Sequence, residues 1–284
     1  MRIILSLMPV SCMLQTTLMI RYLIPIILIF VSSCSPQYLK TASTPKDAMS
    51  GTEFYKKIMN ASREEREQVA VQEIESGNIP LFLKKLLPVH TSITDSTGKI
   101  IKATYYVMSD YLSIGNDKDF ARIPLTPMAA RQIADFYQCF LPTRKMVNDI
   151  YQQASVKLEP VPMYIYRDSA ITFWQHQLII EGQRKGKKGL IAGIKKDVVL
   201  SDKITRDNKS DRVAIYGWHK PDGKPIQPLF TGHVNWYVDY SHGIRLVYNK
   251  IKVNGRWVDY KTVLQHPVWK VLLCDEEYCD CYSY

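Results

Sequence analysis

The sequence predicts an α+β fold in which N-terminal helices are followed by a mostly antiparallel, β-rich portion. Capping residues and helical spacing of apolar residues dominate up to about residue 155, whereas alternating apolar residues and turn dipeptides dominate from Met163 onward. Of the 284 residues, 46% are hydrophobic and 23% are charged, which is typical of a folded chain and excludes a disordered one.

The first 34 residues have the layout of a secretory signal. Arg21 precedes an apolar run over 23–31, which is too short for a transmembrane helix of about 20 residues. Two serines and Cys34 follow, and the stretch VSSC resembles a bacterial lipobox. The resemblance implies a lipid on Cys34 as the first mature residue; the alternative is an uncleaved anchor. We expect a lipid-anchored, extracytoplasmic protein of the bacterial cell envelope, on the outer membrane.

Composition divides the rest of the chain. Residues 35–51 are rich in Ser, Thr, Pro, Lys and Ala and are interpreted as a tether between the membrane and the domain. Residues 52–284 are then a single α+β domain, helical to about residue 155 and β-rich after it. We therefore expect residues 1–34 as the signal segment, followed by a short linker and one folded unit.

Start signals locate the expected helices. A capping box at Ser62 predicts a helix over 62–76, ended by a Gly-Asn pair. Residues 79–87 are apolar around two lysines and favour a second, short helix. Threonine followed by proline predicts a helix over 126–139, and Pro142 begins a further one.

Turns locate the expected strands. A turn at Thr97–Gly98 divides an alternating stretch over 94–111, and the pattern is mostly strand from Met163 onward. Asn254–Gly255, between IKV and RWV, is a strong hairpin signal because both residues tolerate positive φ. The second half should therefore consist largely of hairpins.

Charge suggests the class of partner. Lys and Arg number 37 against 27 Asp and Glu, a net charge of +10; a chain beginning at Cys34 has 35 against 27, or +8. This excess suits anionic glycans, peptidoglycan or phospholipid surfaces. The sequence contains no basic tail, zinc-finger spacing or RNA-recognition motif, so we expect no nucleic-acid partner. It also has no HExxH motif, and we expect neither a metal nor a cofactor.

Four cysteines remain if Cys34 carries a lipid: Cys139, Cys274, Cys279 and Cys281. An extracytoplasmic location permits disulfides, and the close spacing of the last three predicts a disulfide in the C-terminal segment. Three pairings are possible and the sequence does not choose among them. A zinc site is disfavoured because C-x4-C-x-C is not a usual ligand spacing.

Side chains suited to catalysis gather in three stretches of the second half, 193–199, 215–228 and 233–246. Imidazoles titrate near neutral pH and are general-base candidates, and a serine hydroxyl is a possible nucleophile. Each histidine has a structural role as its alternative. The candidate catalytic residues are His219, His233, Ser241 and His242.

Arg245 is the main candidate for substrate binding, since a guanidinium can hold a carboxylate or a developing oxyanion. Its alternation with Ile244 and Leu246 places it on the opposite face of a strand, toward a cleft expected to include His219 or His233. For Lys195 and Lys196, the alternative to substrate binding is a place in the solvent-exposed start of a strand. The other candidate binding residues are Lys195, Lys196 and Tyr240.

The motifs LPTRK, KKDVV, IYGWH, GKPIQP and DYSHGIRLV together resemble a family of secreted bacterial lipoproteins of unknown function, from about residue 110 onward. Separately, 241–246 is similar to the SHGCIRL motif of L,D-transpeptidases, which cross-link peptidoglycan through a cysteine thioester. Those enzymes place a second histidine upstream, as His219 is here. The catalytic cysteine of that motif is absent here, since Gly243 is followed directly by Ile244. We therefore keep peptidoglycan as an expected partner but do not expect thioester chemistry.

Two functions are consistent with these observations. The first is a hydrolase acting on peptidoglycan or another cell-surface glycan. The second is a non-catalytic glycan- or wall-binding lipoprotein, for which 18 Tyr and 5 Trp offer stacking surfaces. An enzyme should bring the three polar stretches into one pocket, whereas a binding protein should expose several aromatic rings.

Overall fold

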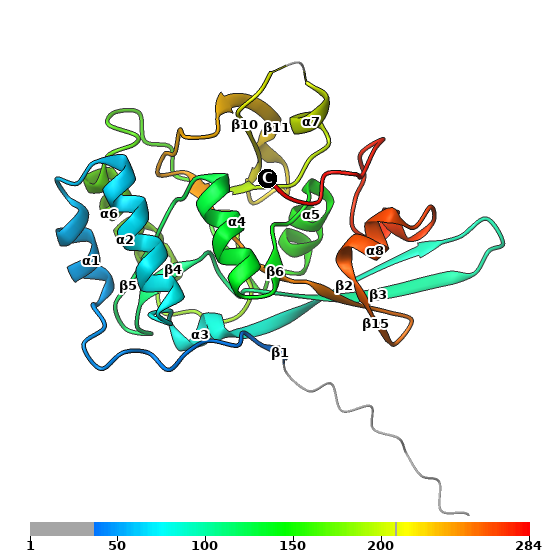
Figure 1. Ribbon diagram of the computed structural model, residues 1–284, viewed down its shortest axis with the longest axis horizontal. Coiled ribbons are helices and arrows are strands. Elements are labelled where there is room, and N and C mark those ends of the chain that lie inside the picture. Colours follow the sequence, from blue (N-terminus) through cyan, green and yellow to red (C-terminus); the bar gives the residue numbers. More distant parts are fainter. Residues whose placement is uncertain (1–36, 208) are drawn as a thin grey trace, which may run out of the picture. The chain divides into compact units, whose positions relative to one another are not determined.

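The computed structural model describes residues 37–207 and 209–284, which belong to one compact unit (Figure 1). Helices and largely antiparallel sheets combine in it, which confirms the predicted α+β class. The signal segment, the lipobox and Cys34 lie outside the described residues. Within the described part of the chain, no helix is long and apolar enough to cross a membrane.

The larger sheet has seven strands and is antiparallel throughout. Its long β2–β3 hairpin turns at Thr97–Gly98, as predicted, and extends to the right in Figure 1. The Asn254–Gly255 hairpin also forms, with φ of 45° and 86°. The strands in spatial order are β1 (Gln37–Tyr38), β2 (Lys85–Thr94), β3 (Ile100–Val107), β13 (Val247–Tyr248) and β6 (Cys139–Phe140), with β14 (Lys250–Val253) pairing β3 and β15 (Arg256–Asp259).

A second sheet of four strands contains half of the eight candidate catalytic and binding residues: Lys196, His219, His233 and His242. Its edge strand β12 runs parallel to β9, and the other pairs are antiparallel. The strands in order are β11 (Pro225–Val234), β10 (Arg212–His219), β9 (Lys196–Val198) and β12 (His242–Gly243). Two short pairs complete the strands: β4 (Ser113–Gly115) with β5 (Phe120–Arg122), and β7 (Val156–Lys157) with β8 (Ile191–Ala192).

Helix starts follow the predicted caps. Ser62 forms a complete capping box at the start of α2, and Thr126 caps α4 with a proline at its first position. The helices are α1 (Gly51–Ile58), α2 (Arg63–Glu75), α3 (Leu81–Lys84), α4 (Pro127–Phe136), α5 (Arg144–Gln153), α6 (Ala170–Arg184), α7 (Lys203–Arg206) and α8 (Tyr260–Gln265), followed by a 3-10 turn (Trp269–Leu272).

Two segments differ from the expected secondary structure. The short helix expected over 79–87 ends at Lys84, and the chain continues directly into β2. Helix α6 lies where mostly strands were expected. Ser169 caps it, and Ala170, Phe173 and Ile180 form its buried stripe at helical spacing. Tertiary burial of this stripe outweighs the β-branched residues that favour a strand.

The segment 37–50, expected to be part of a tether, packs against the domain instead. Its first two residues pair with β2 as strand β1, and the next one, Leu39, is buried in the core. The Leu39 amide donates to the Lys84 carbonyl at 2.8 Å, and the Thr44 hydroxyl donates to the Gly77 carbonyl at 3.0 Å. The folded unit therefore begins close to Cys34.

Candidate functional site

Two loops far apart in the sequence, 163–169 and 235–241, are joined beside the smaller sheet. The Tyr240 amide donates to the Arg167 carbonyl at 2.9 Å, and the Met163 amide donates to the Tyr240 hydroxyl at 2.6 Å. The Arg167 guanidinium lies 2.7 Å from Asp239. These contacts fix the backbone of each loop against the other.

Asp239 is the centre of the polar groups in this region. Its Oδ1 accepts hydrogen bonds from the Ser241 amide at 2.8 Å and from the Ser241 hydroxyl at 2.5 Å. The His242 Nε2 lies 4.0 Å from the same oxygen, and the ring centroids of His233 and His242 are 6.0 Å apart. We call Arg167, His233, Asp239, Ser241 and His242 the Asp239 cluster.

At neutral pH the cluster contains one ionised carboxylate, Asp239, near two neutral imidazoles. Burial alone would raise the pKa of Asp239, but His242, the Ser241 hydroxyl and Arg167 bring it down to about 2. Burial lowers the pKa of His242 to about 4, against the attraction of Asp239. Because His242 is then neutral at pH 7, Arg167 is the cation that compensates Asp239.

Ser241 is poorly placed as a nucleophile. Its hydroxyl donates to Asp239 and not to an imidazole, and a carboxylate with a pKa of about 2 is a weak base for its proton. Ser241 and His242 are both buried, and His233, on the surface side, is the only half-exposed histidine of the cluster. In this arrangement a substrate atom reaches His233 but neither of the other two.

His219 lies apart from this cluster, against helix α5. Its ring stacks on Tyr151 with centroids 4.5 Å apart, and its Nε2 is 3.0 Å from the Asn148 side-chain oxygen. Burial lowers its pKa to about 4. The preceding residue, Trp218, has φ of 58° and packs on Tyr240 instead. His219 and Trp218, although adjacent on β10, therefore pack against different parts of the domain.

Arg245 does not line an open cleft, contrary to the sequence-based expectation. It is 1% exposed, and its two terminal nitrogens donate to the carbonyls of Met108 and Ile191 at 2.8 and 2.7 Å. Its guanidinium lies over the Tyr111 ring, and its Nε is 3.9 Å from Asp197. The expected strand does not form either: residues 244–246 lie between β12 and β13, and all three side chains are buried.

Gly243 shows why no side chain occupies the position before Ile244. A Cβ atom there would come within 2.5 Å of the Tyr111 ring and 2.7 Å of the Lys195 side chain. Both obstacles are buried and have little freedom to shift. The tight packing excludes a cysteine at this position in the present arrangement.

The remaining candidate binding residues act within the fold. Lys195 is buried, donates to the Tyr240 carbonyl and lies 3.2 Å from His176 Nδ1. Burial lowers the pKa of Lys195 to about 7. Lys196 lies over the Trp218 ring, and burial lowers its pKa too. Tyr240 is buried, and its hydroxyl accepts a hydrogen bond from the Met163 amide.

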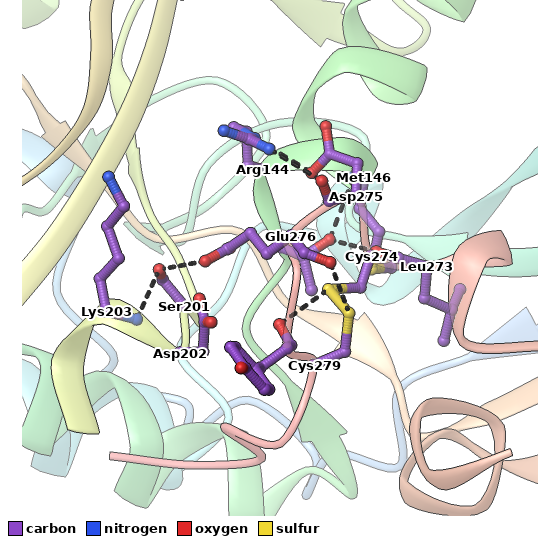
Figure 2. Close-up of a disulfide and its surroundings, with 12 residues drawn as sticks. Arg144, Met146, Ser201, Asp202, Lys203, Leu273, Cys274, Asp275, Glu276 and Cys279 are labelled. Carbon is purple, nitrogen blue, oxygen red and sulfur yellow. Dashed lines mark hydrogen bonds and ion pairs between the residues drawn. A yellow bond between two sulfur atoms is a disulfide. The ribbon is translucent and has the colours of Figure 1, made fainter. Parts of the chain in front are cut away.

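The C-terminal segment contains the predicted disulfide, formed by Cys274 and Cys279 (Figure 2). Figure 2 also shows the Glu276 side chain directed toward Ser201, with 2.7 Å between its Oε2 and the hydroxyl. Cys139 and Cys281 are buried, and burial raises the pKa of both thiols. No described cysteine therefore presents an accessible thiolate.

The two loops also carry exposed aromatic rings that the motif analysis missed. Tyr164, Tyr166 and Trp236 are 84%, 75% and 56% exposed, and we call them the aromatic face. The Arg63 guanidinium lies 5.4 Å from the Trp236 ring centroid and is paired with Asp168. The run MYIYR at 163–167, with two aromatic residues beside an arginine, was the available signal.

A groove of about 150 Å³ lies beside Trp236. It is lined by the start of α2, including Arg63 and Arg66, and by the segment before α4. No three His, Cys, Asp or Glu side chains of residues 37–207 and 209–284 are placed to hold a metal ion. No family model, curated protein or solved structure matches the chain.

Proposed function

We propose that the chain is a lipid-anchored, extracytoplasmic protein of the bacterial envelope that binds an anionic glycan, peptidoglycan included, without cleaving it. The observation that carries this proposal is the aromatic face beside Arg63. Exposed Tyr and Trp rings stack on sugar rings, and guanidinium groups pair with carboxylates or phosphates. Anchoring follows from the lipobox-like stretch ending at Cys34.

The geometry of the loops favours binding. Their backbones are held through Arg167, Asp239 and Tyr240, so the exposed rings are displayed on a fixed support. A fixed support lowers the entropy lost when a ligand binds. The buried positions of Ser241 and His242 also favour binding over cleavage, since a catalytic group must contact the reacting atoms of the substrate.

Sedimentation with purified peptidoglycan and with an acidic polysaccharide tests the binding. Trp236→Ala should lower the affinity at least about tenfold, as expected for a central aromatic contact. Trp257→Ala is the matched control, because Trp257 is 49% exposed but lies on β15 in the larger sheet. Equal losses in the two variants, or binding in neither the parent nor the variants, would contradict the proposal.

The anchor has its own test. Cys34→Ala should abolish labelling of the protein by a fatty-acid analogue and should prevent cleavage at this residue. Retained labelling would place the lipid elsewhere. This result is independent of the glycan assay, so the two parts of the proposal fail separately.

Hydrolysis is a second candidate, favoured by one observation. His242 has a buried Nε2 without a hydrogen-bond partner, and it faces His233, which is half-exposed. Burial lowers the pKa of His233, so a neutral base is available at pH 7. If soluble fragments are released from peptidoglycan and His233→Ala stops the release without loss of binding, hydrolysis replaces simple binding.

A further inference from the structure

A groove beside strand β1 has a composition that glycan binding at the aromatic face does not explain. Its volume is about 550 Å³, within the range of small-molecule sites. One wall is apolar and the rim is positively charged. The apolar residues are Tyr38, Leu81, Phe82, Leu87 and Ile191, and the cations are Lys85, Arg184 and Lys188. We call this feature the β1 groove.

A basic loop forms part of the rim. Residues 184–188 read RKGKK, so four of five are cationic. Lys185 and Gly186 have φ of 49° and 71°, which turns the chain sharply at the end of α6. The three lysines are exposed and, among the described residues, form no ion pair. Their charge is therefore available to an external anion.

The cations of the groove are combined with apolar surface. The Arg184 guanidinium packs on the rings of Phe82 and Phe120, and its Nε lies 2.9 Å from Glu181. Leu81 and Tyr38 are 66% and 51% exposed at the edge. Asp117 is the one carboxylate of the lining, and it accepts a hydrogen bond from the Phe82 amide.

The groove is near the proposed attachment point along the chain, because Tyr38 in its lining is four residues after Cys34. Cys34 is three residues before Gln37, and an extended chain spans at most about 3.6 Å per residue, so the two Cα atoms are within about 11 Å. Because 37–50 packs against the domain, only residues 35 and 36 stand between Cys34 and the part of the chain that is held on the domain. Figure 1 shows β1 beside α3, which carries Leu81.

We infer that the β1 groove and the basic loop bind the headgroups of anionic phospholipids in the bilayer that holds Cys34. The inference rests on the proposed lipid anchor. An anionic headgroup joined to its glycerol and acyl chains pairs negative charge with apolar surface, which matches the charged rim and apolar wall. Lysines near an anionic bilayer strengthen binding by about fivefold each. The contact gives the anchored domain one orientation on the membrane.

Vesicle co-sedimentation tests this inference with a chain beginning at Ser35, which retains the whole compact unit but not Cys34. The probes are phosphatidylcholine vesicles with and without phosphatidylglycerol. The parent should bind only the anionic vesicles, and less at high salt. Lys185→Glu/Lys187→Glu/Lys188→Glu should lower the partition coefficient at least about tenfold.

A charge-matched variant is the control. Lys203→Glu/Lys220→Glu/Lys224→Glu changes the net charge equally, but on α7 and the β10–β11 hairpin, at positions that do not line the β1 groove. It should bind vesicles within about twofold of the parent, since the effect of each charge fades over about 10 Å. Equal losses in both variants would reduce the effect to net charge and overturn the inference.

Two further outcomes separate this inference from the proposed function. Trp236→Ala should keep vesicle binding, because Trp236 is not part of the β1 groove. If the parent ignores anionic vesicles, the inference fails even when Cys34 is acylated. If the loop variant instead loses binding to an acidic polysaccharide while vesicle binding is unchanged, the loop belongs to the glycan site and the inference is overturned.

Discussion

The Asp239 cluster and the β1 groove use polar side chains in opposite ways. In the cluster, Asp239 accepts from Ser241 and pairs with Arg167, all within the fold. In the groove, Lys85 and Lys188 have no ion-pair partner among the described residues and are exposed. The first region is richer in residue types used in catalysis, and the second is more available to a ligand.

This difference shows that a region rich in residue types used in catalysis is not necessarily the region that binds a ligand. A buried group that is already paired must break that pairing before it binds a ligand, and an unpaired buried group costs about 1–3 kcal/mol. An exposed lysine breaks no internal bond. The cluster and Arg245 should therefore contribute mainly to stability, whereas the β1 groove and the aromatic face should contribute mainly to binding.

Arg245→Met should cause the largest loss of stability among the variants considered. It leaves the carbonyls of Met108 and Ile191 without their donors and Asp197 without its nearest cation. The free energy of unfolding should fall by about 3–5 kcal/mol, as for one-sided loss of a buried charge pair. Urea denaturation at pH 7 measures this. Arg245→Lys keeps the charge but not both hydrogen bonds, so its loss should be intermediate.

Arg256→Met is the matched control, since Arg256 is exposed on β15. Its effect should stay within about 0.5 kcal/mol. If Arg245→Met is equally mild and glycan binding falls instead, Arg245 contacts ligand and the comparison between the two regions fails.

Local signals in the sequence predicted the parts of the fold that depend on few residues. The capping box at Ser62 and the Asn254–Gly255 turn each need only neighbours along the chain, and both form as expected. Helix α6 was missed because its identity depends on burial of one face against the rest of the domain. Burial is a property of the whole fold.

The candidate site was predicted less well for the same reason. The sequence of residues 239–246 suggested catalytic and binding side chains that line a cleft. In the structure, however, Arg245 and Ser241 are both buried. Spacing predicts which side of a strand a residue occupies but not what lies against that side. The RKGKK run at 184–188 was visible in the sequence, but its proximity to β1, on which the proposed lipid contact depends, is seen only in the structure.

The C-terminal segment is partly buried and is joined to the domain by polar contacts, including the hydrogen bond from Ser201 to Glu276. Replacing Cys274 and Cys279 by serine removes a disulfide that spans five residues. For so short a loop the loss of stability should be about 2 kcal/mol. Unfolding with and without a reductant measures it, and reduction should leave the double variant unchanged. A mass two hydrogens below that of the reduced parent would verify the bond.

Glu276→Gln should give the smallest effect, and its sign depends on pH. Burial, with Asp202 nearby, raises the pKa of Glu276 to about 7, above its ordinary 4.5. The folded state therefore favours the protonated acid: its stabilisation is complete below pH 4.5 and is lost as pH rises through 7. The amide cannot ionise, so the variant should be more stable than the parent at pH 8, by about 1 kcal/mol after allowance for solvent screening.

At pH 4 the two proteins should have nearly equal stability, because the parent carboxyl is then neutral as well. Urea titrations at both pH values measure the difference, and Glu277→Gln, an exposed neighbour, is the control. A gain of the same size at pH 4 and pH 8 would assign the effect to packing. A gain at pH 8 alone shows that partial burial makes this carboxyl titrate within the fold, a behaviour intermediate between the sealed Asp239 cluster and the open β1 groove.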